Sequence, residues 1–276
     1  MKFHPMGLVC NGGATRSFLA RLPALLARLG PVKASTFRIA RQISHSLRAG
    51  QAASHYSALE PCPMIWFAIP DSSLDRTLRD FAAQTPLHQP MVVLCESARP
   101  SSVPAPLARI GARVVWLHPV PESRERLFVA EGHSDPLRVL QRLFAEDGRK
   151  LIELKPGGRP LFFAGIHFAS PLLLPWFAGA MESLRASGLT RAEAAAVCEN
   201  LGVRTLRHYA KTGDRAWSRK IAPALRHVLE QDLEPIRRLN PRLAELYEKG
   251  IRAALQKFDP KFNSKPVNAK SVNSNS

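Results

Sequence analysis

Acidic residues are scarce in this sequence. Its 276 residues include 22 Asp and Glu against 39 Lys and Arg, which gives a formal net charge of +17 at pH 7. Such a charge favours anionic ligands through long-range attraction. The basic residues nevertheless recur at helix-surface spacing, as Arg204, Arg207 and Lys211 do, and they form no dense block. Aromatic residues make up only 7% of the chain and no nucleic-acid-reading motif is present, so nucleic-acid binding is not expected.

Cysteine is also rare, and it lacks the spacing of a metal site. The four cysteines, Cys10, Cys62, Cys95 and Cys198, are scattered and form no CxxC pair. We therefore expect buried free thiols in a reducing cytosol, with no disulfide and no metal ligands. No apolar segment of signal-peptide length precedes Asn11, so a cytoplasmic protein is expected.

One apolar run is long enough to raise the question of a membrane. Residues 160–181, PLFFAGIHFASPLLLPWFAGAM, contain no acid, lysine or arginine, and about 20 apolar residues suffice to cross a bilayer. His167, Ser170, Pro171 and Pro175 interrupt the run, and no second run of this kind follows. We therefore expect a buried helix at the centre of a helical domain, and no membrane span.

Up to about residue 154, short apolar runs alternate with amphipathic segments. The apolar runs predict β-strands over residues 7–10, 32–35, 64–69, 91–95, 113–117, 127–130 and 150–154. Helical spacing lies between them, for example at Ile39, Ile43 and Leu47. This alternation predicts an α/β fold with a mostly parallel sheet and helices on both faces.

The pattern changes after the turn-forming run at residues 155–160. Thr190 and Glu193 then form a capping box that opens one helix, and Asn240-Pro241 opens another that runs to about Phe258. The last residues are polar and basic, without an apolar pattern. The predicted parts are a nucleotide-binding domain over 1–156, an all-α domain over 157–260 and a disordered basic tail over 261–276.

The segment after the first predicted strand lacks two of the three glycines of a dinucleotide loop. The motif GxGxxG lets the chain turn tightly, approach the pyrophosphate and pack the next helix. This sequence reads CNGGATR there, so only the middle glycine is kept. Backbone N–H groups at a helix start still favour a phosphate, although a plain strand-to-helix turn is the alternative. The candidate phosphate ligands are Gly12, Gly13, Ala14, Thr15 and Arg16.

An acidic residue is missing where NAD-binding proteins have one. Such proteins place the acid about twenty residues after the loop, where it binds the ribose hydroxyls. Here the second predicted strand is followed by Ser35, Thr36, Phe37 and Arg38. Two hydroxyls and an arginine suit a 2'-phosphate better than a free ribose. We therefore predict NADP as the cofactor, with Ser35, Thr36 and Arg38 among its ligands.

Several segments together resemble a known family. They are GPVKASTFRIARQISHSLRAG from Gly30, IWFAIPDSSL from Ile65, VVLCESA from Val92, GARVVWLHPV from Gly111, FFAGIHFASPLL from Phe162 and AWSRKIAP from Ala216. Their order and spacing resemble bacterial Rossmann-like proteins with a helical C-terminal domain of unknown function. Those proteins are related to pyrroline-5-carboxylate reductase, prephenate dehydrogenase and deazaflavin-dependent NADP oxidoreductases. The resemblance spans residues 7 to about 258.

The resemblance implies a fold, a cofactor and an assembly. The fold is a Rossmann-like domain followed by a helical domain of the 6-phosphogluconate dehydrogenase-like type. The helical domain forms a homodimer contact in such proteins, and a small-molecule substrate lies in a cleft between the two domains. Ile69, Pro70 and Asp71 are then expected beside the cofactor.

Three further side chains are candidates for chemistry. His118 follows a strand end, where a histidine can titrate near neutrality and act as a proton donor or acceptor, although a loop histidine fixed by Pro119 is the alternative. By the resemblance, Ser97 would come from the preceding strand end and Ser170 would reach the cleft from the helical domain. Neither serine has a matched base in sequence, so each is expected to position a substrate rather than to attack it.

The sequence also departs from the family in four places. Family members carry His-Cys-Ser-Gly where this chain has residues 95–98, Ser-Asn where it has Ser170-Pro171, Thr-Gly-Pro where it has residues 218–220, and histidine where it has Phe163. Two functions therefore stay open. One is an NADP-dependent oxidoreductase, and the other is a catalytically silent dimeric protein that binds a nucleotide or another protein.

Overall fold

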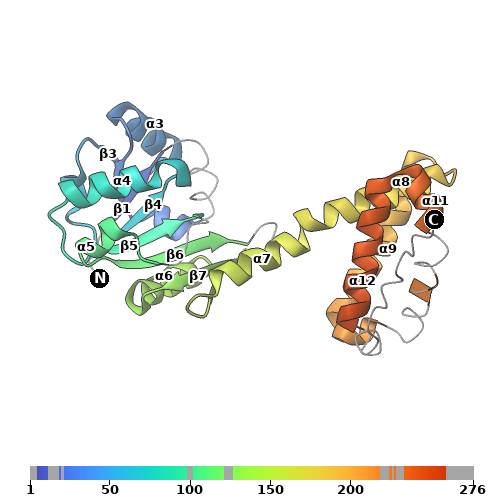
Figure 1. The fold of residues 1–276 in the computed structure, drawn as a ribbon. Coiled ribbons are helices and arrows are strands. Elements are labelled where there is room, and N and C mark those ends of the chain that lie inside the picture. The colour runs from blue at the N-terminus through green and yellow to red at the C-terminus, as the bar shows by residue number, and fades with distance from the viewer. Residues whose placement is uncertain are drawn as a thin grey trace, which may run out of the picture. The chain divides into compact units, whose positions relative to one another are not determined.

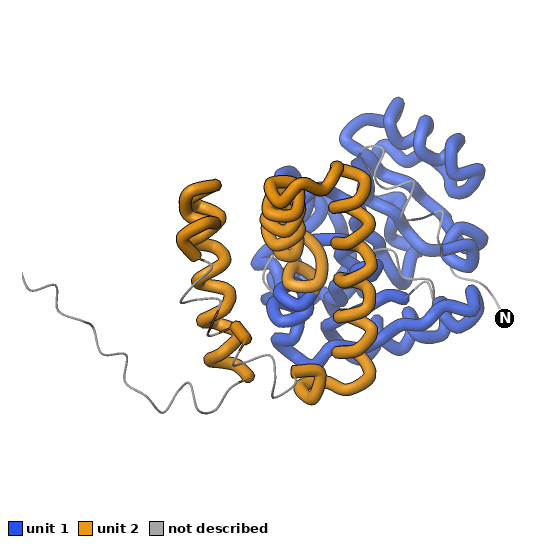
Figure 2. The backbone as a smooth tube through the Cα atoms, turned by 90° about the vertical axis from the view of Figure 1, so that its right-hand side faces the viewer, with its two compact units in different colours: residues 1–165 blue, residues 166–276 orange. Residues whose placement is uncertain are grey.

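The computed structural model describes residues 5–11, 19, 22–97, 102–120, 127–217, 224–225, 227 and 233–258. The chain divides into two compact units, residues 1–165 and residues 166–276 (Figure 2). The division falls inside a helix, Arg159–Ala169, that follows the turn-forming run at residues 155–158. The predicted tail at 261–276 lies outside the described residues.

The first unit is built on an eight-stranded sheet with the order β3-β2-β1-β4-β5-β6-β7-β8 (Figure 1). The strands are β1 Met6–Cys10, β2 Leu29–Lys33, β3 Gln51–Ala53, β4 Met64–Ala68, β5 Met91–Cys95, β6 Arg113–Pro119, β7 Leu127–Gly132 and β8 Lys150–Glu153. Every pair is parallel except β6 and β7. The sheet order and the strand directions confirm the predicted α/β fold class.

The antiparallel pair follows from a short connection. Only residues 120–126 join β6 to β7, whereas a parallel pair needs a crossover of a dozen or more residues. Most of the predicted strands begin or end within one or two residues of the predicted bounds, and the larger differences are in β2 and β3. β2 begins at Leu29 rather than at residue 32, because Gly30 and Pro31 break the apolar run that marks a strand. β3 was not predicted, since its three residues QAA carry no apolar alternation.

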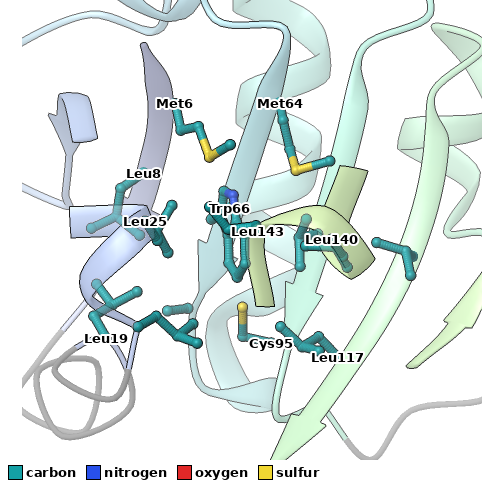
Figure 3. Packing of buried hydrophobic residues seen from close by; sticks show 14 of the residues in the cluster. Met6, Leu8, Leu19, Leu25, Met64, Trp66, Cys95, Leu117, Leu140 and Leu143 are labelled. Carbon is teal, nitrogen blue, oxygen red and sulfur yellow. The ribbon is translucent and has the colours of Figure 1, made fainter. Parts of the chain in front are cut away.

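Helices bury both faces of the sheet. Helices α2 Pro23–Leu26, α3 Phe37–Leu47 and α6 Ser134–Glu146 pack on one face, and α4 Asp71–Gln84 and α5 Ala105–Arg109 pack on the other. Neighbouring residues of a strand point to opposite faces. Trp66 of β4 therefore lies in the first core with Leu140 and Leu143 of α6 (Figure 3), while Phe67 lies in the second core.

The second unit is helical in the part that the structure describes. It holds the end of α7 Arg159–Ala169, then η2 Pro171–Leu173, α8 Leu174–Ala186, α9 Arg191–Thr212, η3 Gly213–Ala216, α11 Leu233–Leu239 and α12 Pro241–Phe258. The predicted capping box is confirmed, since Thr190 Oγ1 accepts from the Glu193 amide at 3.3 Å and the Glu193 carboxylate accepts from the Thr190 amide at 2.8 Å. The predicted helix after Asn240 is confirmed as α12.

The apolar run does not form the expected buried helix within this chain. It is divided at Ser170 into α7 and α8, and Leu161, Phe168, Leu174 and Trp176 are between 44% and 78% exposed. Among the described residues, the stretch Arg159–Ala186 is long and apolar enough, by length and composition alone, to cross a membrane. Core helices pass the same test, so this finding is weak evidence for a span.

Candidate active site at the carboxyl edge of the sheet

The carboxyl ends of the parallel strands bring several predicted site residues to one edge of the first unit. Ile69, Pro70 and Asp71 follow β4, Ser97 follows β5, and His118 is the penultimate residue of β6. Ser35 follows β2 at the same edge. Open α/β sheets bind their ligands at this edge.

The glycine loop cannot be placed. The predicted phosphate ligands Gly12, Gly13, Ala14, Thr15 and Arg16 lie outside the described residues, so phosphate binding by this loop stays a prediction. The chain is described up to Asn11, the residue that follows β1.

The ends of β1 and β2 are tied together by a side-chain hydrogen bond. The Ser35 hydroxyl donates to the Asn11 side-chain oxygen at 3.1 Å. Thr36 is the N-cap of α3, where its Oγ1 accepts from the Ile39 amide at 3.2 Å. Ser35, Thr36 and Arg38 are exposed, and the first turn of α3 contains no acid. This corner therefore offers hydroxyls, one cation and a helix N-terminus to an anion.

Asp71 and Ser97 lie against each other although they come from different elements. Asp71 is the first residue of α4, where a carboxylate stabilises the helix N-terminus. The Ser97 hydroxyl donates to Asp71 Oδ1 at 2.5 Å, and Ser97 is buried. The backbone reaches this position through Glu96, whose φ of 55° lies in the left-handed region. The contact fixes the chain after β5 to the start of α4.

His118 is buried and bonded to an arginine that the sequence analysis did not single out. Arg159 Nε donates to His118 Nε2 at 3.2 Å. The same guanidinium donates from Nη2 to the backbone carbonyl of Ser97 at 2.5 Å. The rings of His118 and Phe163 pack in a T-shaped arrangement, with their centroids 4.9 Å apart. Arg159 therefore joins the end of β5 to the end of β6.

Two contacts hold Arg159 in place: its guanidinium stacks on an aromatic ring, and its backbone amide donates to a carboxylate. Its guanidinium lies 4.1 Å from the centre of the Trp116 ring, a favourable cation–π distance. The two oxygens of Glu131 accept from the amides of Gly157 at 2.7 Å and Arg159 at 3.0 Å, so Glu131 caps the start of α7. Arg159 is 1% exposed. Burial lowers the pKa of Arg159, while the negative charges of Glu131 and Asp71 oppose that shift.

Burial also changes the chemistry available to His118. Desolvation, followed by the positive charge of Arg159, lowers the pKa of His118 from 6.5 to about 4, and Asp71 opposes the shift. The ring is therefore uncharged at neutral pH, which differs from the titration near neutrality that its position after a strand suggests. Its part in a reaction stays a prediction.

The last predicted site residue, Ser170, lies apart from the others in the chain. Ser170 belongs to the second unit, where it follows α7 and is exposed, and its contribution to a substrate site stays a prediction. Among the described residues, no group of three or more His, Cys, Asp or Glu is arranged to hold a metal ion.

Sequence reasoning missed Arg159 and Glu131. Arg159 lies in a Gly-Gly-Arg-Pro turn that indicates a linker, and Glu131 is the penultimate residue of a strand that is otherwise free of charge. The available signal was a cation at the first position of a helix, where the helix dipole disfavours positive charge and an acid must compensate it. That signal does not identify which acid lies nearby.

Comparisons with known proteins bear on the fold. No protein-family model matches the chain, and no curated protein is similar to it in sequence. Solved structures do match. An imine reductase of Myxococcus stipitatus in complex with NADP+ gives a TM-score of 0.62 at 16% identity, over 92% of this chain and 95% of that one. A protein of Bacteroides fragilis to which NADP oxidoreductase activity is ascribed gives 0.69 at 17% identity, over 92% and 98%.

A third structure bears on the resemblance. A pyrroline-5-carboxylate reductase of Coxiella burnetii gives a TM-score of 0.52 at 14% identity, over 96% of this chain and 100% of that one. The chain has the fold of Rossmann-like reductases. The resemblance to relatives of pyrroline-5-carboxylate reductase is thereby confirmed at the level of fold. In a Rossmann-like reductase fold, the edge that carries Asp71, Ser97 and His118 is the edge at which ligands bind.

Proposed function

We propose that this chain is an NADP-dependent oxidoreductase that acts on a small molecule. The observation that carries the proposal is the acid-free corner after β2, where Ser35, Thr36 and Arg38 are exposed at the N-terminus of α3. The Myxococcus stipitatus enzyme with the same fold is solved with NADP+. NADP supplies or accepts a hydride when bound, and the protein binds and orients the reactants.

The residues of this corner suit a phosphate monoester. Arg41 lies close to one turn beyond Arg38 on α3 and is also exposed, so the first turns of this helix carry two exposed cations after the hydroxyls of Ser35 and Thr36. An NAD site needs an acceptor for the ribose hydroxyls, and α3 contains no Asp or Glu. The chemistry of this set therefore fits the 2'-phosphate of NADP.

Binding measurements with two matched dinucleotides test the cofactor. We expect NADPH at about 100-fold excess over its Kd to raise the free energy of unfolding by about 2.7 kcal/mol, and NADH to have much less effect. Replacing Arg38 and Arg41 by Ala should weaken NADPH binding roughly tenfold or more, because hydrogen bonds to charged groups are worth about 1.5–3 kcal/mol. Arg142→Ala, on the exposed side of α6, serves as the control. Absence of stabilisation by either dinucleotide would contradict the proposal.

A catalytically silent protein is the second candidate function. It is supported by Phe163, which stands where relatives carry a histidine and which packs on the buried His118. If this candidate is right, NADPH binds but no imine or carbonyl compound is reduced, as followed by the absorbance of NADPH. Turnover of any such substrate above the rate without protein rejects it.

We also propose that two copies of the chain associate through the second unit. Large apolar side chains on α8 and α9 are exposed, among them Trp176, Leu201 and Leu206. A mostly apolar groove of about 620 Å³ lies between these helices and α12. In contrast, the buried apolar cluster of this unit consists, among the described residues, of Ile251 and Leu255 with three partly buried side chains packed against them. Such an exposed apolar surface is typical of a subunit interface.

We also propose that the protein is cytoplasmic. Its four cysteines are free thiols, and three of them are buried, as a reducing compartment allows. Fractionation of cells that produce the full chain tests this placement, with a secreted and a membrane protein as markers.

A further inference from the structure

The guanidinium of Arg159 lies in a fixed position against the ring of His118. It reaches His118 and the Ser97 carbonyl at once, through Nε and Nη2. The Trp116 ring covers its face at 4.1 Å, and the backbone amide of the same residue is fixed to Glu131 at 3.0 Å. The side chain is thus held at its base, its face and two of its nitrogens, so its direction relative to His118 is set by four contacts.

A guanidinium has only donors, and this decides where the imidazole proton is. His118 Nε2 must accept the hydrogen bond from Arg159 Nε, so it carries no proton. In a neutral imidazole the single proton is then on Nδ1. Protonating Nε2 would set an N–H against an N–H and two positive charges side by side, and the contact would break.

We propose that Arg159 is a positioning residue that holds His118 uncharged in its Nδ1–H tautomer. His118 can then offer the carboxyl edge of the sheet a hydrogen-bond donor, but it cannot supply an acidic proton from a charged ring at neutral pH. A role for this donor in catalysis rests on the proposed oxidoreductase function. The tautomer and charge of the ring do not, and they are measurable without any cofactor.

The charged groups around the His118 ring have opposite effects on its pKa, and Arg159 is the one that bonds the ring. Arg159 from α7 bonds the ring directly, whereas Asp71 from α4 acts at longer range and favours the charged ring. Glu131 from β7 directs both oxygens to backbone amides at the start of α7. Phe163, which packs on the ring, is apolar. Burial and Arg159 together therefore outweigh Asp71, consistent with the lowered pKa of His118.

Nuclear magnetic resonance of the full chain labelled with ¹⁵N in histidine tests the proposal. The signals of His118 are assigned by their loss in His118→Gln. In the wild-type protein we expect the Nδ1–H pattern and no titration between pH 5.5 and 8. A ring that titrates near 6.5, or that carries its proton on Nε2, overturns the proposal whatever the protein catalyses.

Variants at the arginine separate its effect from burial alone. In Arg159→Met we expect the pKa of His118 to rise from about 4 toward 6.5 and the Nε2–H tautomer to appear. Arg159→Lys keeps a donor and should largely retain the wild-type pattern, while Arg142→Met should leave it unchanged. A His118 pattern in folded Arg159→Met identical to that of the wild type shows that burial suffices, and it refutes the role of Arg159. If Arg159→Met does not fold, as judged by circular dichroism, the wild-type and Arg159→Lys spectra decide.

Discussion

At the scale of single residues, the most unusual feature is a buried arginine. Arg159 is 1% exposed, and its Nη1 has no hydrogen-bond partner among the described residues. A buried charge is tolerated where hydrogen bonds and opposite charges offset its desolvation. Here the offset comes from Ser97, His118 and Trp116 at the guanidinium and from the nearby charge of Glu131.

Removing that arginine should therefore cost stability. Arg159→Met removes the hydrogen bonds from the charged guanidinium to the Ser97 carbonyl and to His118 Nε2, and a hydrogen bond to a charged group contributes roughly 1.5–3 kcal/mol. We expect the urea midpoint of Arg159→Met to fall accordingly, whereas Arg142→Met on the exposed side of α6 should change the free energy of unfolding by less than about 0.5 kcal/mol. Equal midpoints for the two variants would contradict this account.

The lowered pKa of His118 predicts a pH dependence of stability. The unfolded chain binds a proton near pH 6.5, and the folded chain binds it only near pH 4. The unfolded state therefore holds more protons between these values, so stability falls as pH decreases from about 6.5 to 4. The maximum loss from this group is about 3 kcal/mol.

The contribution of His118 is isolated by comparison with a variant that cannot titrate. His118→Gln keeps an acceptor for Arg159 but has no ionisable ring. Urea unfolding at intervals from pH 4 to pH 7 should give a steeper decrease for the wild-type protein than for His118→Gln. Parallel curves would mean that the buried ring does not resist protonation.

At the scale of elements, one glycine determines how β7 meets β6. Gly132 ends β7 with a φ of 153°, and a Cβ there would lie 2.3 Å from the Val114 carbonyl oxygen. Both the conformation and the close backbone approach exclude a side chain.

Two glycine variants distinguish these causes. Gly132→Ala should destabilise the protein by several kcal/mol, because the contact is with backbone that cannot move aside. Gly148→Ala has a φ of 62° but nothing within 4 Å of the added carbon, so it should cost only about 1–2 kcal/mol of backbone strain. Chemical denaturation measures both, and a loss for Gly132→Ala no larger than that for Gly148→Ala would contradict the steric argument.

The capping box of α9 gives a second prediction for an element. Thr190→Ala removes the acceptor for the Glu193 amide and should lower the free energy of unfolding by about 1 kcal/mol. Thr205→Ala, an exposed position inside the same helix, should not lower it, because alanine is the best helix former. The thermal midpoint should therefore be lower for Thr190→Ala than for Thr205→Ala, and equal midpoints would contradict the role of the cap.

At the scale of the whole molecule, the proposed association predicts the mass in solution. We expect sedimentation equilibrium to give twice 30.5 kDa. Leu201→Glu and Leu206→Glu place charges on the exposed apolar face of α9 and should produce monomers. Ile152→Glu alters an exposed apolar residue of β8 in the first unit and should leave the dimer intact. A wild-type protein that stays monomeric at all concentrations refutes the association.

Much of the fold could be predicted from local sequence. Strands β4 and β5 are buried on both faces of the sheet, so their sequences are continuous apolar runs. Such runs predict strands without any knowledge of the neighbouring strands. The helix starts at Thr190 and Asn240 are set by side chains that bond amides within three residues. Arg159 and Glu131 escaped prediction because Arg159 bonds residues 41 and 62 positions away and Glu131 bonds an amide 28 positions away, and no local pattern reports such distances.

The sequence by itself determined the alternation of strands and helices, the caps and the acid-free corner after β2, since each depends on residues close together in the chain. Only the tertiary structure decided that β7 runs antiparallel and that Arg159 is bonded to Glu131, His118 and Ser97. Only it placed His118 beside a cation in a buried position. The physical reason is that burial and charge proximity arise from packing between distant segments, and these two quantities set the state of an ionisable group.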